Sequence, residues 1–424
     1  MKIAVEGCAH GDLDNIYATL QHLERVQNTK IDLLICCGDF QAVRNEQDLE
    51  SLACPPKFRA MNTFWKYYSG AEKVPIPTVF VGGNHEASNY LWELYYGGWA
   101  APDIFFLGFA GVVTFGGIRI GGLSGIFKHH DFRTGHYERP PYNPSDMKSV
   151  YHVREYEVHK LKRIREPLDV FVSHDWPRGI ANYGDKEGLL RYKPYFRQEV
   201  ESNTLGSPPG EELLHALQPT YWFAAHLHCK FAALVPHKNG QSTRFLALDK
   251  PLPNHRFLQI IDVETKGPLR FEYDPEWLAI TRSYDAHLPL SKAPFRPPRP
   301  PLDLTASRKW VERTLETRGR TVPLNFEVTA PVHDPLNRSR HFGPAGHLRN
   351  PQTEAFLRML ELPYRLDHAA PPSGFRETSV EPQQTGVSTA NPEEIDLDDL
   401  PDDDALDDDG LPDDVDELAQ SVHT

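Results

Sequence analysis

The chain has 424 residues, enough for one large or two ordinary domains, and a formal net charge of −14 at pH 7 from 45 Lys and Arg against 59 Asp and Glu. Much of this imbalance is local, because residues 393–417 hold 15 acidic residues and no basic one, which leaves 45 basic against 44 acidic residues elsewhere. A nearly neutral body does not exclude a nucleic-acid partner. No apolar run approaches the length of a bilayer span, so we expect no membrane partner.

The first part of the chain alternates between strand and helix patterns. Apolar runs predict buried strands at residues 2–7 and 31–37, and residues 13–26 between them have helical spacing. Residues 42–72 predict helical structure with four aromatic anchors, Phe58, Phe64, Trp65 and Tyr67. A third buried strand is expected at residues 77–81. Glycine-separated runs then predict antiparallel strands at residues 105–107, 112–115 and 118–120.

The second part begins with a helical pattern at residues 150–165. Strands are expected afterwards at residues 169–173, 221–225, 231–236, 243–249 and 257–263. Proline-rich residues 289–301 predict an extended linker, and residues 303–318 and 352–361 predict helices of a small C-terminal region. From about residue 371 onward, Pro, Ser, Gln and the acidic run predict disorder.

Five of the expected strands end in polar side chains that could share one site. These clusters are Cys8-Ala9-His10, Gly38-Asp39, Gly83-Asn84-His85-Glu86, His174 and His226-Leu227-His228. Because residues i and i+2 of an extended segment point to the same face, His226 and His228 can converge. Imidazole, carboxylate and amide oxygen suit a borderline divalent metal such as Zn, Fe or Mn. A single loop histidine is usually a surface residue, but five clusters at strand ends favour a metal site.

The cysteines are Cys8, Cys36, Cys37, Cys54 and Cys229. Their number is odd, their spacing is irregular, and no signal peptide precedes them. We therefore expect a reducing, intracellular compartment.

The strand-end motifs resemble the calcineurin-like metallophosphoesterase superfamily over about residues 1–235. The sequence departs from its usual first motif, Asp-x-His, with Cys8-Ala9-His10. A narrower resemblance, to the lariat debranching enzymes, extends to about residue 280. It is carried by residues 7–11, by Cys36-Cys37-Gly38-Asp39-Phe40-Gln41-Ala42-Val43-Arg44-Asn45, by Ser173-His174-Asp175-Trp176-Pro177 and by Ala225-His226-Leu227-His228.

The resemblance implies an α/β fold with a two-sheet β-sandwich core flanked by helices. Residues 1–240 would form the metallophosphoesterase catalytic domain, and residues 124–154 within it a loop that recognises lariats. Residues 241–370 would form a C-terminal region with the proline-rich linker. Residues 371–424 would be a disordered acidic tail.

The resemblance also implies two adjacent pockets that hold one or two divalent ions, Fe(II), Zn or Mn. The ligands that it implies are Cys8, His10, Asp39, Asn84, His174, His226 and His228. Asp39 would bridge the two pockets. Asn84, His174 and His226 would complete the first pocket, and His10 and His228, with Cys8 close by, would form the second. A Cys8 thiolate would favour Fe(II) or Zn over Mg, whereas a buried neutral thiol would leave its pocket weak, and both interpretations stay open.

The implied reaction is hydrolysis of the 2′,5′-phosphodiester at the branch point of excised intron lariats, which linearises them for turnover. A metal-bound hydroxide would attack phosphorus in line, and the branch 2′-oxygen would leave. That oxygen needs a proton. His85 follows a ligand without being one in the resemblance, so it is the candidate general acid.

Aromatic and basic residues alternate through residues 124–154. The substrate-binding candidates are Phe127, Lys128, His129, Phe132, Arg133, His136, Tyr137, Tyr142, Tyr151 and Arg154. Such a mixture suits unstacked RNA, because bases stack on rings while Arg and Lys meet phosphates. The alternative is an ordinary long loop with scattered aromatics.

Two other functions stay open on sequence alone. A phosphoprotein phosphatase shares Gly-Asn-His-Glu, but residues 38–44 lack the Asp-Arg pair of its Gly-Asp-x-x-Asp-Arg-Gly motif. A metal-free interaction scaffold is disfavoured because every ligand position except the first holds a competent residue. The acidic tail could recruit splicing or intron-turnover proteins, mimic nucleic acid or only solubilise the chain. A nuclear location is expected from the resemblance and its substrate, since no compact import signal is present.

Overall fold

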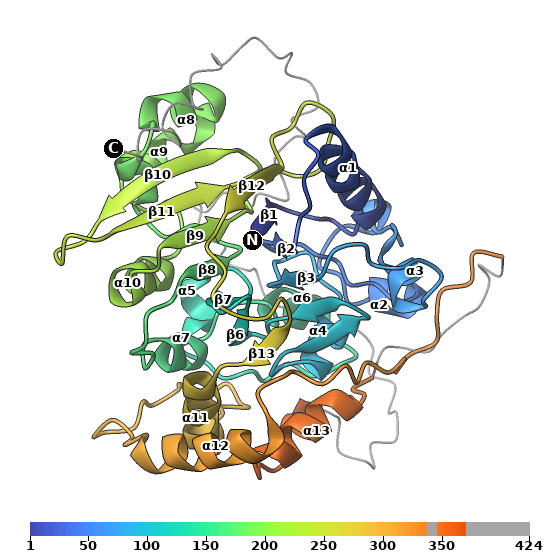
Figure 1. Ribbon diagram of the computed structural model, residues 1–424, viewed down its shortest axis with the longest axis vertical. Helices are drawn as coiled ribbons and strands as arrows, with labels where there is room; N and C mark the ends of the chain where they lie inside the picture. The colour runs from blue at the N-terminus through green and yellow to red at the C-terminus, as the bar shows by residue number, and fades with distance from the viewer. Residues whose placement is uncertain (337–345, 370–424) are drawn as a thin grey trace, which may run out of the picture. The chain divides into compact units, whose positions relative to one another are not determined.

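The computed structural model describes residues 1–336 and 346–369 (Figure 1), and within them the strands form two sheets. The acidic tail lies outside the described residues. In sheet order, the first sheet holds β12 (Leu258–Asp262), β1 (Lys2–Glu6), β2 (Leu33–Cys36), β3 (Thr78–Phe80), β5 (Ile104–Phe106) and β4 (Gly98–Ala101). Also in sheet order, the second sheet holds β10 (Phe231–Pro236), β11 (Ser242–Ala247), β9 (Tyr221–Ala224), β8 (Val170–Ser173), β7 (Ile118–Leu123), β6 (Ala110–Phe115) and β13 (Phe271–Tyr273).

The middle of each sheet is parallel. Strands β1, β2, β3 and β5 run in one direction, as do β7, β8, β9 and β11 in the second sheet. Loops that follow parallel neighbours therefore emerge at one edge of a sheet. The antiparallel prediction is confirmed for β6 and β7. For the run at residues 105–107 it is confirmed on one side only, because β5 pairs antiparallel with β4 but parallel with β3.

Alternating side chains of the central strands divide between two cores. In β1 and β2, Ile3 and Leu33 face the second sheet and pack with Val170, so the two sheets form a sandwich. Ala4 points the other way and packs with Leu20 of helix α1 (Leu13–Val26). The predicted two-sheet core flanked by helices is confirmed.

Short helices cover the sandwich and its loops. Besides α1 they are α2 (Glu46–Leu49), α3 (Phe64–Tyr68), α4 (Ser88–Glu93), α5 (His129–Phe132), α6 (Pro144–Ser149), α7 (Glu155–Leu161), α8 (Lys186–Tyr192), α9 (Arg197–Glu201) and α10 (Pro208–Leu217). The 3₁₀ turns are η1 (Pro56–Phe58), η2 (Ile180–Tyr183), η3 (Pro194–Phe196), η4 (Asp285–His287) and η5 (Leu366–Ala369). No helix in the described ranges has the length and hydrophobicity needed to cross a bilayer.

The continuous helical pattern expected at residues 42–72 is wrong. The segment breaks into α2, η1 and α3, because Pro55 and Pro56 interrupt it. Phe64 and Tyr67 are buried as expected, but Phe58 is 54% exposed and is not part of the core.

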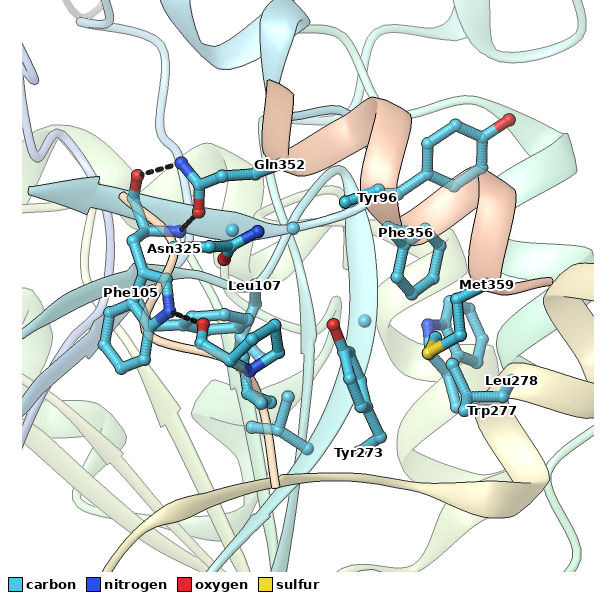
Figure 2. Close-up of a pocket in the computed structure, with 18 of the residues that line it drawn as sticks. Tyr96, Phe105, Leu107, Tyr273, Trp277, Leu278, Asn325, Gln352, Phe356 and Met359 are labelled. Atoms are coloured by element: carbon cyan, nitrogen blue, oxygen red, sulfur yellow. Dashed lines mark hydrogen bonds between the residues drawn. The ribbon is translucent and has the colours of Figure 1, made fainter. Parts of the chain in front are cut away.

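Three further helices, α11 (Pro275–Tyr284), α12 (Thr305–Arg318) and α13 (Pro351–Met359), build a second small core from residues such as Leu278, Val311 and Leu357. Both predicted C-terminal helices are therefore present. A cavity of about 210 Å³ lies between these helices and the edge strands β4 and β13 (Figure 2). The Gln352 side chain beside it bonds the backbone N–H and carbonyl of Trp99 at 2.8 and 2.9 Å.

The segment after residue 240 supplies strands to both sheets. Strand β11 lies between β10 and β9 in the second sheet, and β12 pairs with β1 in the first. The C-terminal part of the chain thus completes the sandwich, and the division of the chain at residue 240 stays a prediction.

Candidate metal centre

The loops after β1, β2, β3, β8 and β9 meet at one edge of the sandwich. Backbone bonds join the first two loops, with His10 N–H donating to the Asp39 carbonyl at 2.6 Å. The His85 N–H donates to Asp39 Oδ1 at 2.8 Å, and His174 Nδ1 lies 3.0 Å from the Cys37 carbonyl. These contacts bring four of the predicted polar clusters together, and the His226 N–H, which donates to Cys8 Sγ at 3.2 Å, adds the fifth.

Asp39 lies at the centre of the cluster with its two carboxylate oxygens facing different imidazoles. Oδ1 is 3.3 Å from His174 Nε2, and Oδ2 is 4.0 Å from His10 Nε2. On the His174 side, Asn84 Oδ1 lies 3.2 Å from the same Nε2 atom, and the His226 ring centroid is 4.9 Å from that of His174. The two oxygens of Asp39 thus face two different imidazoles, and its role as a bridge between two pockets stays a prediction.

On the other side of Asp39, Cys8, His10, Asp39 and His228 offer four ligand atoms that all lie within 4.8 Å of one another. The two Nε2 atoms of His10 and His228 are 3.3 Å apart. Cys8 is fully buried, and its Sγ accepts the His226 N–H at 3.2 Å. A set of two imidazoles, a carboxylate and a thiol fits a borderline divalent ion such as Zn or Fe(II).

The protonation states of His10, His228 and Asp39 suit metal binding, whereas burial raises the pKa of the Cys8 thiol, and Asp39 outweighs burial to raise the pKa of His174. Burial lowers the pKa of His10 to about 4, although Asp39 acts to raise it. Burial together with His10 and Lys250 lowers the pKa of His228 well below its usual range. Burial alone would raise the pKa of Asp39, but His174 and His85 outweigh it and hold that pKa well below its ordinary value. Neutral imidazoles beside an ionised carboxylate are the forms that bind a metal ion.

Several residues of the cluster adopt a backbone conformation that non-glycine residues rarely take. The residues with left-handed φ are His10 (44°), Asp39 (44°), Gln41 (54°), His226 (69°) and His228 (45°). Such conformations cost free energy and persist only where surrounding contacts hold them, and they concentrate at functional sites.

Gly83 and Gly38 allow the loops to approach this closely. A Cβ atom on Gly83 would lie 2.2 Å from Asp39 Oδ1 and 2.7 Å from His174 Nε2. Gly38 has φ of +117°, and a Cβ there would lie 2.3 Å from His174 Nδ1. Any side chain at either position would therefore displace Asp39 or His174.

Glu86 connects the loop that contains Gly38 with the loop that contains Gly83. Its carboxylate accepts the backbone N–H groups of Phe40, Gln41 and Gly83 at 2.7, 2.9 and 2.9 Å. Burial raises the pKa of Glu86 to about 7. Glu86 is thus a support for the loops that carry Asp39 and Asn84.

Two supporting residues have no role in the sequence-based interpretation. The Gln41 side chain lies with Nε2 3.1 Å from His10 Nδ1, and Asn62 donates to the His10 carbonyl at 2.6 Å. Gln41 belongs to the motif at residues 36–45, which could have drawn attention to it. Asn62 follows no strand and carries no motif, so nothing in the sequence indicated it.

His85 lies beside the ligand cluster without joining it. Its side chain is half-buried, and its ring centroid is 5.6 Å from that of His10. His85 is absent from the group of four convergent ligand atoms. The proposed division between Asn84 as ligand and His85 as proton donor stays a prediction.

Residues 124–154, which we call the recognition loop after the role predicted for them, start directly beside this cluster. Ser124 Oγ accepts the Gly82 N–H at 2.9 Å, and the Gly125 N–H donates to the Gly82 carbonyl at 2.8 Å. The Phe127 N–H donates to Asp175 Oδ2 at 3.0 Å, next to His174. The turn that carries Asn84 and the loop are therefore one connected unit.

Most of the substrate-binding candidates reach the surface. His129 and Arg133 are exposed, and the candidates with partly exposed side chains are Phe127, Lys128, Phe132, Tyr137, Tyr142 and Tyr151. His136 and Arg154 do not reach it, being 3% and 1% exposed. The Arg154 guanidinium pairs with Glu138 and donates to the carbonyls of Asp131 and Ser149. His136 and Arg154 therefore lie in the interior of the loop, and the substrate-binding role of the candidates stays a prediction.

The segment expected to be a linker, residues 289–301, packs against the recognition loop. The Gly135 and His136 N–H groups donate to the Ser291 and Pro289 carbonyls at 2.9 and 3.0 Å, and the Phe295 N–H donates to the Arg133 carbonyl at 2.7 Å. We call residues 289–295 the strap. These backbone bonds attach the strap to residues 133–136 of the recognition loop.

Two family models match the chain. Residues 1–230 match the calcineurin-like phosphoesterase model, and residues 240–365 match the model of the C-terminal domain of lariat debranching enzymes. The Arabidopsis thaliana lariat debranching enzyme is 56% identical over 94% of this chain and 96% of its own length. Lariat debranching enzyme A of Xenopus laevis is 53% identical over 85% of this chain and 70% of its own length. The Homo sapiens lariat debranching enzyme is 47% identical over 95% of this chain and 80% of its own length.

The matches cover both the sandwich with its ligand cluster and the segment after residue 240 that completes it. A phosphoesterase fold, a cluster of metal-type ligands and relatives about half identical over most of their length agree with one another. The chain is a metal-dependent phosphodiesterase that belongs to the lariat debranching enzyme family.

Proposed function

We propose that the chain hydrolyses the 2′,5′-phosphodiester at the branch point of excised intron lariats and uses Asp39, His85 and the recognition loop in distinct roles. The observation that carries this proposal is the connection between the ligand cluster and the loop. The loop start bonds to Gly82 and Asp175, one or two residues from the proposed ligands Asn84 and His174. A branched RNA held on the loop would therefore have its phosphate near the ligands.

The proposed ligands are Cys8, His10, Asp39, Asn84, His174, His226 and His228, for one or two ions of Fe(II), Zn or Mn. An ion bound there supplies positive charge that neutralises the phosphate oxygens and lowers the pKa of water that attacks phosphorus. Asp39 holds its two oxygens toward His174 and His10 at 3.3 and 4.0 Å. Its orientation fixes the relation between the two proposed pockets, with the buried Cys8 thiol proposed as a member of the second.

His85 is the proposed proton donor to the leaving 2′-oxygen. Its backbone N–H donates to Asp39 Oδ1 at 2.8 Å, and its ring is half-buried. A positioned general acid contributes on the order of 10²–10⁴-fold to the rate.

The recognition loop is proposed to distinguish branched from linear RNA. Aromatic rings such as Phe132 and Tyr137 would stack with unpaired bases, and Arg133, which is 75% exposed in its side chain, would meet phosphates. Because the proposed substrate is an excised intron lariat, we propose that the chain acts in the nucleus. The acidic tail is proposed either to bind splicing or intron-turnover proteins or only to solubilise the chain.

Synthetic 2′,5′-branched RNA tests the proposal. The purified chain is freed of metal, supplied separately with Fe(II), Zn or Mn, and incubated with the branched RNA and with a linear 3′,5′-linked RNA of equal composition. We expect linearisation of the branched RNA with at least one metal and no cleavage of the linear RNA. Equal cleavage of both, or of neither with every metal, would exclude the proposed substrate.

A further inference from the structure

A second cluster of ligand-type side chains lies inside the recognition loop, apart from the metal centre. His130, Asp131 and His152 offer three ligand atoms that all lie within 4.8 Å of one another. Asp131 Oδ2 is 2.6 Å from His152 Nδ1 and 3.3 Å from His130 Nε2. The cluster shares no residue with the four convergent ligands around Asp39.

The buried charges around this cluster are unbalanced. Arg154 pairs with Glu138 and lies with Nη1 3.7 Å from Asp131 Oδ1, and all three side chains are at most 9% exposed. One guanidinium therefore faces two acidic side chains. The Asp131 carboxylate is thus buried beside a guanidinium that it shares with Glu138, and two imidazole rings lie next to it.

We propose that His130, Asp131 and His152 bind a divalent transition-metal ion of the zinc class that fastens the recognition loop. Two imidazoles and a carboxylate are a zinc ligand set, and tetrahedral Zn bonds of 2.0–2.1 Å place ligand atoms about 3.3 Å apart. The His130–Asp131 separation of 3.3 Å already has that value. The His152–Asp131 contact is a hydrogen bond of 2.6 Å that opens when the ion replaces its proton.

The surroundings of the cluster allow an ion to enter, and they place it where it could join the two ends of the loop. The His130 side chain is 69% exposed, which leaves an entry path and room for a water as fourth ligand. His130 and Asp131 lie on α5 near the start of the loop, whereas His152 lies near its end, in a bridge with Ile126. An ion would therefore join both ends of the loop. This site stands on the geometry of the loop itself and does not depend on the proposed reaction.

Metal analysis of full-length variants tests the site. The variants His130→Ala and His152→Ala are compared with His129→Ala, a neighbouring exposed histidine outside the cluster. After equilibration with buffered zinc and removal of excess, we expect the first two to hold about one zinc ion fewer per chain than His129→Ala. Asp39→Asn, which removes a ligand of the metal centre, should keep the loop ion.

Two further readouts separate an ion site from a simple His152–Asp131 hydrogen bond. Zinc should raise the melting temperature of an Asp39→Asn background, and the added His130→Ala substitution should abolish that increase, because an ion that binds only the folded state stabilises it. His130 is exposed, so its replacement leaves no cavity. Equal zinc content in all three histidine variants, or an equal zinc response with and without His130, would overturn the proposal.

Discussion

Replacement of Gly83 by alanine should disable the metal centre although it replaces none of the proposed ligands. The added Cβ atom would lie 2.2 Å from Asp39 Oδ1, 2.5 Å from the Asp39 nitrogen and 2.7 Å from His174 Nε2. Relief of these overlaps requires Asp39 or His174 to move by about 1 Å, and a misplacement of that size costs about 10²-fold in rate. Overpacking of a rigid interior adds a loss of about 1–3 kcal/mol in the free energy of unfolding.

The neighbouring Gly82 provides a matched control. A Cβ atom there would meet the tip of the Leu91 side chain at 3.0 Å, which can shift, and no proposed ligand. Both variants are assayed for metal content, for hydrolysis of branched RNA and of bis(p-nitrophenyl) phosphate, and for denaturant unfolding. We expect Gly83→Ala to lose both activities about 10²-fold and Gly82→Ala to stay within a few-fold of the parent. Equal effects of the two alanines would refute the steric reasoning.

Three other changes have defined outcomes. Gly135→Ala puts a Cβ atom 2.5 Å from the Pro289 carbonyl oxygen and should separate the strap from the recognition loop. We expect kcat/KM for branched RNA to fall about tenfold while hydrolysis of a small phosphodiester persists. Equal loss of both activities would show that the strap does not act through the loop. Arg154→Met leaves Glu138 and Asp131 without their buried cation and should lower the free energy of unfolding by about 3–5 kcal/mol, as measured with urea; a loss below about 1 kcal/mol would contradict the assigned structural role. Burial lowers the pKa of Lys160 to about 8 against an ordinary 10.5, so its charge costs stability below pH 8, and this cost disappears as pH rises from about 8 to 10.5. The free energy of unfolding should therefore rise over that range by up to about 3 kcal/mol relative to Lys160→Met, and an unchanged difference between the two proteins would argue against a buried charge.

The sequence was a good guide wherever one periodic pattern determined the structure. The central strands and α1 are present because alternating apolar residues such as Ile3 and Ala4 face two different cores. The five polar clusters converge because parallel strands deliver their loops to one edge. The order of the strands, and the insertion of β11 between β10 and β9, depend on long-range pairing that no local pattern encodes.

The sequence was a poorer guide where burial is decided by partners far along the chain. Arginine is a residue type that often contacts RNA, yet Glu138 and the carbonyls of Asp131 and Ser149 hold Arg154 inside the loop. Proline-rich residues 289–295 have the composition of a linker, but backbone bonds to Gly135 fix them as a strap. Asn62 supports His10 from a segment without any motif.

The division of roles within Gly83-Asn84-His85-Glu86 has one direct test, which uses the leaving group. His85→Ala is assayed with branched RNA, whose 2′-oxygen needs a proton, and with bis(p-nitrophenyl) phosphate, whose phenolate leaves without one, and metal content is measured on the same sample. We expect a loss on the order of 10²–10⁴-fold for the branched RNA, little loss for the nitrophenyl ester, and unchanged metal. Equal losses on both substrates, or a parallel loss of metal, would contradict His85 as the proton donor.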